Sequence, residues 1–365
     1  MPSRRDLLKT AIAMPALLQA QSPNDTVRVA VIGVGNRGSY DLKNVMKVPG
    51  VKIVALCDID ADRLEKAKAA VTAAGGDAPA TYTDFRKMLD ERKDIDATVI
   101  ATPVDTHKMI AIDALEVGTN VYCEKPMATT PEDVRLMAAA AKSAKGIFQA
   151  GFQLRHDPRR KASIEFIHAG GIGKVLFLQG YRHSGDLPHE TAWYFDRTRS
   201  GDNIVEQACH ILDLFTWTAG SHPLRVYGSG GINLFKNDPP GRTTMDNYAV
   251  IYEYPDDVRL VFSHIYFDPP GFSGVKERVF GAKGAIDLPT ATWSEREKKG
   301  EIKLDVPDVD KDSTYQSLAA FIDNARGRKT PLNNADSAAL STLVAMMGRK
   351  AIYERRIVTW EEMAG

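Results

Sequence analysis

The sequence predicts a two-domain protein in which a doubly wound parallel α/β domain is followed by an α+β domain with an open, mainly antiparallel sheet. Between Val27 and about Ala150, short apolar runs alternate with segments of helical periodicity, as in repeated βαβ units. Beyond Gly151 the pattern changes to segments rich in Val, Ile, Tyr and Phe that are separated by turn residues. A chain of 365 residues is long enough for two hydrophobic cores of ordinary size.

The first domain, residues 27–150, is expected to alternate buried strands with helices. Apolar runs bounded by turn residues predict the strands, and apolar spacing near 3.6 predicts the helices. One helix start is well marked, because Thr130 can cap the helix, Pro131 fits its first turn and two acids follow. The expected strands are 27–32, 51–57, 97–101, 120–123 and 147–150, and the expected helices are 40–48, 61–74, 83–91, 105–117 and 131–143.

The second domain, residues 151–365, is expected to be a sheet faced by helices. Tyr254-Pro255-Asp256-Asp257 has the composition of a hairpin turn between two of its strands. The last two helices are expected to pack back on one or both domains. The expected strands are 174–182, 224–235, 247–254 and 259–267, and the expected helices are 158–168, 203–218, 315–325 and 336–353.

Three glycines follow the first expected strand, in the order Gly33-Val34-Gly35-Asn36-Arg37-Gly38. The first allows a tight turn, the second lets the backbone approach a pyrophosphate, and the third lets helix and strand pack closely. Asp58 ends the next strand about 20 residues later, where a carboxylate accepts hydrogen bonds from an adenosine ribose. The alternative is a turn without a ligand. This context predicts a Rossmann dinucleotide site made by Gly33, Gly35, Asn36, Arg37, Gly38 and Asp58.

The carboxylate of Asp58 indicates which dinucleotide the site binds. A negative charge at this position repels a 2′-phosphate, so NAD is favoured over NADP. Arg37 and Arg63 could offset the repulsion, which leaves NADP as the alternative.

Residues 1–26 are expected to be a twin-arginine signal peptide and a linker. Arg4 and Arg5 precede the apolar run 10–20, and the small residues around Ala20 fit a cleavage site. The run is too short to span a bilayer. Because this route moves folded proteins that carry cofactors, we expect a periplasmic or otherwise exported protein that brings a tightly bound dinucleotide with it. The alternative is a basic, disordered N-terminus.

Charge and cysteine content exclude several classes of protein. Lys plus Arg and Asp plus Glu both total 47, so nothing indicates nucleic acid or an anionic membrane as a partner, and a small, weakly charged substrate is expected. Three cysteines argue against a disulfide framework. Cys57 and Cys123 end strands that are three spacings apart in the doubly wound order, roughly 14 Å, so both are expected to be free thiols.

Two further motifs carry a resemblance to a known family. Ala101-Thr102-Pro103 with His107 follows one strand, and Cys123-Glu124-Lys125-Pro126 follows the next. From Val27 to about Thr359 the chain resembles the family of glucose-fructose oxidoreductase, inositol 2-dehydrogenase and MocA, and Glu-Lys-Pro is the most specific of its short motifs. The resemblance implies that Thr102, Pro103, His107 and Glu124 contact the cofactor and that Lys125 lies beside the nicotinamide and the reacting sugar hydroxyl.

A physical argument supports the role of Lys125. A positive nicotinamide ring and a dry pocket both disfavour the ammonium form, so we expect the pKa of Lys125 to be lowered. The alternative is that Glu124 and Lys125 form an exposed pair in a turn.

The segment Glu206-Gln207-Ala208-Cys209-His210-Ile211-Leu212-Asp213 is the third candidate. On one helix, Glu206, His210 and Asp213 would project from the same face. His210 and Asp213 match the pattern of the sugar dehydrogenases in the family, whereas Glu206 replaces the usual Asp and Ala208 the usual Gly. We expect His210 to remove a hydroxyl proton, Glu206 to orient His210 or to bind a sugar hydroxyl, and Asp213 to contact substrate. The alternative is that His210 is a core histidine.

Other candidates lie where the two domains are expected to meet. Gln153 could contact the nicotinamide ribose, and Arg155 and His156 the substrate. Trp193 and Tyr194 offer a flat apolar face to a sugar ring, although they could equally pin their loop. His183, His189, Glu206 and His210 match no metal signature, so no metal is expected.

These observations predict an NAD(P)-dependent oxidoreductase that acts on a carbohydrate hydroxyl or ketone. An exported enzyme has no free NAD to draw on, so the cofactor is expected to be held tightly and recycled in place. One alternative is a redox-neutral, NAD-dependent glycosidase or lyase, and another is a sugar-binding protein without turnover. By family resemblance we also expect a homo-oligomer, a dimer or a tetramer.

Overall fold

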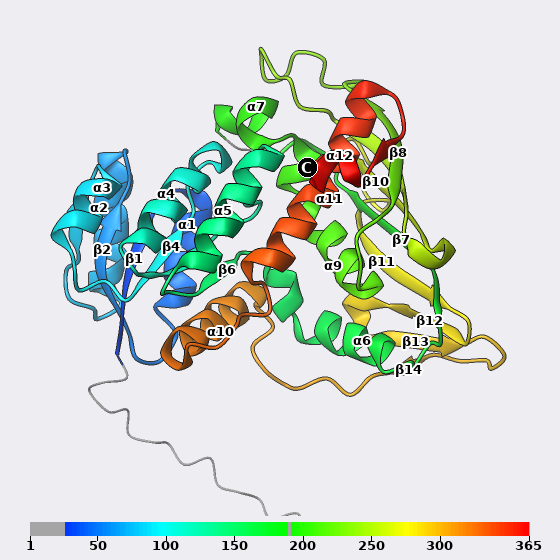
Figure 1. Cartoon of the computed structure of the whole chain (residues 1–365), viewed down its shortest axis with the longest axis horizontal. Coiled ribbons are helices and arrows are strands. Elements are labelled where there is room, and N and C mark those ends of the chain that lie inside the picture. Colours follow the sequence, from blue (N-terminus) through cyan, green and yellow to red (C-terminus); the bar gives the residue numbers. More distant parts are fainter. Residues whose placement is uncertain (1–25, 189–190, 365) are drawn as a thin grey trace, which may run out of the picture.

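The computed structural model describes residues 26–188 and 191–364. All but the last residue of the expected leader segment, 1–26, lies outside them, as does His189. Figure 1 shows two domains side by side, the first in blue and cyan and the second mainly in green and yellow. Within the described residues, no helix is both long enough and apolar enough to cross a membrane.

The first domain is built on a six-stranded sheet with the order β3-β2-β1-β4-β5-β6. All neighbouring strands pair in parallel. From β1 to β3 the strands are added toward one edge of the sheet, and from β4 to β6 they are added on the other side of β1. The expected doubly wound sheet is therefore confirmed. β3 was not predicted because it has three half-buried residues at the sheet edge. The strands are β1 (Val27–Ile32), β2 (Val51–Cys57), β3 (Ala80–Tyr82), β4 (Ala97–Ile100), β5 (Asn120–Cys123) and β6 (Phe148–Ala150).

Five helices connect these strands, and their starts follow from capping chemistry. The Asp60 side chain accepts hydrogen bonds from two backbone amides of α2, and the Thr130 side chain accepts one from α5. The first helix starts at Asn36, directly after the glycine turn and earlier than expected. The helices are α1 (Asn36–Val45), α2 (Ala61–Ala73), α3 (Phe85–Glu91), α4 (Val104–Glu116) and α5 (Pro131–Ser143).

The second domain contains a nine-stranded sheet with the order β14-β13-β12-β11-β7-β10-β9-β8-β15. Its pairs are antiparallel except for β7 with β10, so the expected open, mainly antiparallel sheet is confirmed. The strands are β7 (Val175–His183), β8 (Arg225–Gly231), β9 (Asn247–Glu253), β10 (Arg259–Ile265), β11 (Gly274–Gly281), β12 (Gly284–Asp287), β13 (Thr292–Glu295), β14 (Ile302–Lys303) and β15 (Val358–Thr359).

Helices cover one face of this sheet and join the two domains (Figure 1). The longest is α11, which packs on α5 of the first domain as well as on β8 and α9 of the second. These elements are η3 (Gln153–His156), α6 (Pro158–His168), η4 (Ala192–Phe195), α7 (Arg197–Ser200), α8 (Asn203–Glu206), α9 (Cys209–Ala219), η5 (Pro255–Asp257), η6 (Leu288–Thr290), α10 (Ser313–Gly327), α11 (Ala335–Glu354) and α12 (Glu361–Ala364).

The expected single helix over 203–218 is wrong, because the chain breaks into α8 and α9 at Gln207 and Ala208. In an unbroken helix the amide of His210 would bond to the carbonyl of Glu206. That carbonyl instead accepts a hydrogen bond from the side chain of Lys125, and the amide of His210 bonds to Gln207, 3.4 Å away. A contact between domains therefore replaces a helical hydrogen bond.

Helix α10 belongs by its packing to the first domain, although it lies near the end of the sequence. Leu318, Phe321 and Ile322 are fully buried in the same cluster as Val29 and Val31 of β1. The ring of Phe321 also meets Tyr122 of β5 edge to face, with centroids 5.6 Å apart. The first domain is thus completed by residues that follow the whole of the second sheet in sequence.

Candidate active site

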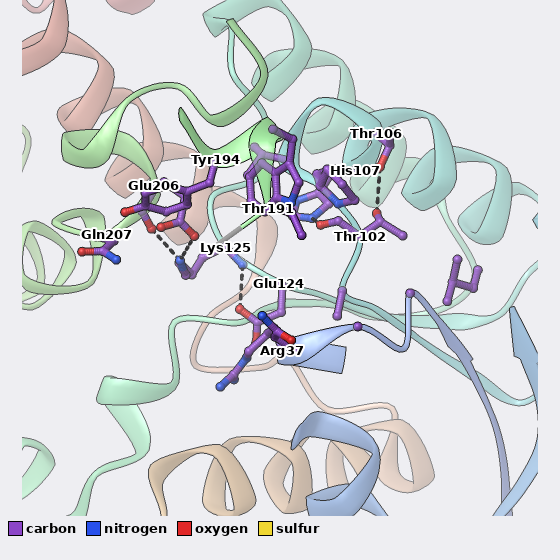
Figure 2. Close-up of a pocket in the computed structure, with 18 of the residues that line it drawn as sticks. Arg37, Thr102, Thr106, His107, Glu124, Lys125, Thr191, Tyr194, Glu206 and Gln207 are labelled. Carbon is purple, nitrogen blue, oxygen red and sulfur yellow. Dashed lines mark hydrogen bonds and ion pairs between the residues drawn. The ribbon is translucent and has the colours of Figure 1, made fainter. Parts of the chain in front are cut away.

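A cavity of about 860 Å³ lies between the two domains, at the carboxyl ends of strands β1, β2, β4 and β5. The second domain contributes the residues around the α8–α9 break, the loop before α7 and parts of β7 and β11. Ligands of doubly wound sheets bind at this edge, beside the point where the strand order reverses. Figure 2 shows the side chains of both domains pointing into this space.

The glycine turn after β1 has the geometry that its motif requires. Gly33 has a φ of 82°, and a Cβ there would lie 2.7 Å from the carbonyl oxygen of Ala101. Gly35 precedes the first turn of α1, where no side chain caps the helix and no acidic residue lies, so the positive end of the helix dipole suits an anion. Gly38 does not line the cavity; a Cβ there would lie 1.8 Å from the carbonyl oxygen of Gly33.

Asp58 lies at the far end of β2 and lines the cavity. Its Oδ2 accepts a hydrogen bond from the amide of Val34 at 2.8 Å, and its Oδ1 accepts one from Asp60 at 3.0 Å. The carboxylate is therefore fixed against the glycine turn. The open helix start, the glycines and this acid are the donor and acceptor set that suits the pyrophosphate and ribose of NAD.

Arg37 and Glu124, both expected to contact the cofactor, bind each other on the cavity wall. Arg37 donates to Glu124 Oε1 from Nε at 2.9 Å and from Nη2 at 2.7 Å. Its Nη2 also lies 3.0 Å from the buried carboxylate of Asp41, whose pKa is raised by burial and by the charge of Glu124. A Cβ at Gly151 would come within 2.6 Å of the Glu124 carboxylate, so a larger residue there would displace that carboxylate.

Lys125 and Glu206 form a largely buried ion pair across the domain boundary, with Nζ and Oε1 2.7 Å apart (Figure 2). Burial acts to lower the pKa of Lys125, but the carboxylate of Glu206 and other nearby groups outweigh it and raise that pKa above its usual value. The expectation of a lowered pKa is therefore wrong for the cofactor-free protein. Lys125 is an ammonium ion here, a hydrogen-bond donor and not a base.

The loop after β4 is held in place by His107. Its Nδ1 lies 2.9 Å from the carbonyl oxygen of Pro126, and its Nε2 lies 2.9 Å from that of Thr102. The imidazole thus lies between the Thr102-Pro103 turn and the Glu124-Lys125-Pro126 turn. Burial lowers its pKa, and the single N–H of the neutral ring donates to one of the two carbonyl oxygens. All of these residues line the cavity except Pro126.

His210 lines the cavity beside Lys125 and packs against the edge of Phe152, with ring centroids 6.2 Å apart. Burial and the positive charges of Lys125 and Arg182 lower its pKa well below the usual value, so the imidazole is neutral. Its Nδ1 is buried without a hydrogen-bond partner among the described residues. The expectation that Glu206 orients His210 is wrong, because Glu206 is bound to Lys125.

Three residues expected to contact substrate lie outside the cavity lining: Arg155, His156 and Asp213. The Arg155 guanidinium donates to both carboxylate oxygens of Asp213, which also accepts from Ser341 at 2.6 Å. Both members of this pair are buried, so each charge neutralises the other inside the protein and does not contact substrate. The break after α8 explains why Asp213 lies outside the cavity lining, since Asp213 no longer shares a helix face with Glu206. Gln153 remains on the cavity wall.

Trp193 and Tyr194 both line the cavity, but they differ in exposure. Tyr194 is 2% exposed and packs in a cluster with Leu187, Phe195 and Tyr266. Its hydroxyl lies 3.2 Å from that of Tyr266. Tyr194 therefore pins its loop, and Trp193 remains the more accessible ring.

Comparison with known proteins identifies the family. A model described as "Oxidoreductase family, NAD-binding Rossmann fold" matches residues 27–152, and one described as "GFO/IDH/MocA C-terminal domain" matches residues 161–287. The chain belongs to the GFO/IDH/MocA oxidoreductase family. The predicted family is thus confirmed, and the first domain is an NAD-binding Rossmann domain.

Curated relatives of this family member include inositol dehydrogenases. Inositol 2-dehydrogenase of Salmonella typhimurium is 26% identical over 287 residues, 77% of this chain and 79% of the relative. The scyllo-inositol 2-dehydrogenase (NAD(+)) of Bacillus subtilis is 29% identical and covers 72% and 74%. A glycosyl hydrolase family 109 protein of Saccharopolyspora erythraea is 37% identical over 166 residues, 44% of this chain but 36% of the relative.

Solved structures share the fold of this GFO/IDH/MocA member over almost its whole length. A levoglucosan dehydrogenase in complex with NADH superimposes with a TM-score of 0.80 at 16% identity, covering 92% of this chain and 99% of that one. A probable dehydrogenase from Thermotoga maritima gives 0.75 at 23% identity, covering 92% and 100%.

Several cavity residues of this family member were not singled out from the sequence. Arg160 of α6 and Glu277 of β11 form a buried ion pair on the cavity wall, with Nε and Oε2 2.7 Å apart. Arg182 of β7 and Gln207 line it as well. A charged residue in a buried strand could have indicated Glu277 as a site residue. That signal was not seen in the sequence, because β11 itself was not predicted. Among the described residues, no cluster of His, Cys, Asp or Glu is arranged to hold a metal ion.

Proposed function

We propose that this protein is an NAD-dependent oxidoreductase that acts on a hydroxyl of a sugar or polyol, or on the corresponding ketone. The observation that carries the proposal is the meeting of Lys125 and His210 in one cavity with the glycine turn and Asp58. The names of the inositol dehydrogenases among its relatives support the same substrate class.

The residues of the cavity fit NAD, and different residues bind different parts of it. The amides at the start of α1 receive the pyrophosphate, and Asp58 receives the adenosine ribose. Thr102, Pro103, His107 and Gln153 lie on the wall that leads from there to Lys125. When bound, the nicotinamide accepts or returns the hydride of the reacting carbon.

Lys125 and His210 then handle the hydroxyl proton. The Lys125 ammonium, held by Glu206, donates a hydrogen bond to the substrate oxygen and stabilises negative charge that develops on it. The neutral His210 accepts the hydroxyl proton as the hydride leaves the same carbon, which gives a ketone and an imidazolium. In the direction of reduction, His210 returns the proton.

The direct test is NADH formation by the purified protein with NAD and a panel of inositols, hexoses and anhydrosugars. We expect Lys125→Ala and His210→Ala to reduce kcat by about 10²-fold or more while NAD still binds. Lys142→Ala is the matched control, because Lys142 is an exposed lysine that does not line the cavity. Normal turnover in either active-site variant removes that residue from the mechanism.

We further propose that the protein is exported by the twin-arginine route with its dinucleotide already bound and recycled in place. The twin-arginine motif Arg4-Arg5 and the apolar run 10–20 support this. Protein recovered from the periplasm is expected to release one dinucleotide per chain on denaturation and to need no added NAD for its first turnover. Protein that arrives empty and turns over with excess soluble NAD contradicts retention but leaves the oxidoreductase assignment intact.

A second candidate is a redox-neutral glycosidase. In that reaction a sugar carbon is oxidised to a ketone, the acidified proton of the neighbouring carbon is removed and the aglycone is expelled, water adds to the resulting double bond, and the ketone is reduced again. The 37% identity to a glycosyl hydrolase family 109 protein over 166 residues favours it. Release of nitrophenol from nitrophenyl glycosides without accumulation of NADH would support it. A sugar-binding protein without turnover has less support, because Lys125 and His210 are both present in the cavity.

The open face of the second sheet supports the proposed homo-oligomer. Tyr227, Ile251 and Val261 are aligned across β8, β9 and β10 and are 53%, 43% and 36% exposed. A row of exposed apolar side chains on a sheet suits contact with a second copy. Light scattering is expected to give a dimer or tetramer for the parent and a smaller species for Ile251→Asp.

A further inference from the structure

Arg182 is a charged residue of the cavity wall whose positive charge is not neutralised. It lies on β7 and donates from Nε to the amide oxygen of Gln207 at 3.3 Å. Among the described residues, no carboxylate lies within ion-pair distance of its guanidinium, and its two Nη groups have no partner.

The other cations on the cavity wall all have a carboxylate within 4 Å, which sets Arg182 apart. The three nearest the domain boundary are Arg37, Lys125 and Arg160, bound to Glu124, Glu206 and Glu277 respectively. The two farther out, Arg63 and Arg199, lie 3.4 Å from Asp60 and 2.8 Å from Asp105.

Consecutive residues at the α8–α9 break hold Lys125 and Arg182 in different ways. Glu206 binds Lys125 with a carboxylate and neutralises it, whereas Gln207 binds Arg182 with a neutral amide. The same amide oxygen accepts a hydrogen bond from the Tyr266 hydroxyl at 2.6 Å. Gln207 therefore fixes the guanidinium in place but leaves its charge available to a ligand.

Building on the proposed function, we propose that the substrate is a sugar acid, a sugar or polyol whose single carboxylate binds Arg182 while one of its hydroxyls contacts Lys125 and His210. Two Nη groups with free donors match the two oxygens of a carboxylate. One cavity is lined by Lys125, Arg182, Gln207 and His210. Lys125 binds Glu206 and Arg182 binds the next residue, Gln207, so one turn of the chain holds both cations.

A carboxylate fits this position better than a phosphate does. One unpaired guanidinium compensates one negative charge, and the adjacent cations Lys125 and Arg160 are already paired with Glu206 and Glu277. A phosphate dianion would leave one charge without a partner in the cavity. The pyrophosphate of the cofactor is served by the start of α1 in the other domain, not by β7.

The central comparison of the test is between glucuronate and glucuronamide, which have the same size but differ in charge. Glucuronate and galacturonate are measured against glucuronamide, glucose, myo-inositol and glucose 6-phosphate, by kcat/KM and by calorimetric binding to the NADH-loaded protein. We expect the acids to be preferred over glucuronamide by about 10-fold to 100-fold, the worth of hydrogen bonds to a charged group. We expect Arg182→Gln to remove that preference and to change the values for neutral ligands by less than about threefold.

Two further variants separate charge from folding and position. Gln207→Glu keeps Arg182 but gives it a carboxylate partner, so it is expected to weaken binding of the acids as Arg182→Gln does. Arg182→Lys keeps the charge without the paired donors and is expected to recover part of the preference. A thermal melt of each variant checks that it is folded.

The outcomes distinguish this inference from the proposed function. NADH formation with neutral polyols that is equal to that with the acids, or an equal loss for both in Arg182→Gln, overturns the inference and leaves the oxidoreductase in place. Preference for glucose 6-phosphate overturns the choice of carboxylate. If no ligand is oxidised, the proposed function fails, and Arg182-dependent binding of glucuronate still decides whether the site is an acid site.

Discussion

The ammonium group of Lys125 binds Glu206 twice, at the carboxylate and at the backbone carbonyl oxygen. The first contact keeps the lysine charged in a buried site, and the second takes the carbonyl that would otherwise continue a helix. One side chain of the first domain therefore shapes the backbone of the second. The charge state of Lys125 and the position of His210 therefore depend on two contacts with a single residue, Glu206.

The first prediction concerns this pair. Burial opposes the charged form of Lys125 and the Glu206 carboxylate supports it, so Glu206→Gln is expected to lower the pKa of Lys125. The rate at which trinitrobenzenesulfonate labels Lys125, followed by peptide mass spectrometry, is expected to rise at a lower pH than in the parent. Lys142 in the same samples serves as the control. An unchanged labelling profile contradicts the electrostatic role of Glu206.

The second prediction concerns cofactor choice at Asp58. Asp58→Ala removes the ribose acceptor, the repulsive charge and the bond to the Val34 amide, so it is expected to weaken NAD and to relax discrimination against NADP. Asp58→Asn keeps an acceptor for the Val34 amide, but it removes the charge and puts an NH2 group in place of the oxygen that accepts from the Asp60 amide. Titrations of both dinucleotides are expected to give a smaller loss of NAD affinity in the Asn variant. Equal NAD affinity in parent and Asp58→Ala would rule out the ribose contact.

The third prediction concerns the buried pair Arg155 and Asp213. Asp213→Asn leaves the Arg155 guanidinium without its carboxylate in a dry site, so the free energy of unfolding is expected to fall by about 3–5 kcal/mol. Chemical denaturation measures this loss. The KM of the folded fraction is expected to match the parent, because the pair lies outside the cavity lining. A large rise in KM with unchanged stability would return Asp213 to the substrate site.

The fourth prediction is a loss of stability in acid that involves His156. Burial lowers the pKa of His156 to about 4, whereas the unfolded side chain titrates near 6.5. Between these two values the unfolded chain binds a proton that the folded protein does not. Stability is therefore lost as the pH falls below 6.5, by about 2 kcal/mol at pH 5 from this residue.

Urea denaturation between pH 7.5 and pH 5 measures that dependence. His156→Gln cannot titrate, so its free energy of unfolding is expected to fall less steeply over the same interval. The comparison uses slopes, because the substitution also changes packing. Parallel slopes in parent and variant would mean that His156 is accessible to protons in the folded state.

The first sheet could be predicted from the sequence because its strands are short, continuous apolar runs between helices. β1, β2 and β5 begin and end where the pattern indicates. β11 was missed, because its interior alternates Lys276, Glu277 and Arg278. Glu277 is fully buried and is stabilised there by Arg160, which lies more than a hundred positions away in the chain.

The same limit explains the errors in the site. Glu206, His210 and Asp213 share a face on any regular helix, and the helix is interrupted by a hydrogen bond from Lys125, a residue of the other domain. Once that bond forms, Glu206 faces Lys125 and Asp213 faces Arg155. Local spacing predicts which side chains would share a face of a regular helix. Partners from distant elements decide which of these side chains contact each other.

Helix α10 gives the first domain a component that is synthesised after the whole of the second domain's sheet up to β14. Leu318, Phe321 and Ile322 close a core whose first strand begins at Val27. A ribosome that adds about 5–20 residues per second needs roughly 15–60 s to travel from β1 to α10. During that time the apolar surface of the first sheet that α10 will bury stays exposed in the nascent chain. Exposed apolar surface of this kind is a binding site for chaperones. The synthesis of α10, and not the end of the Rossmann segment, therefore sets the moment at which this domain can become native.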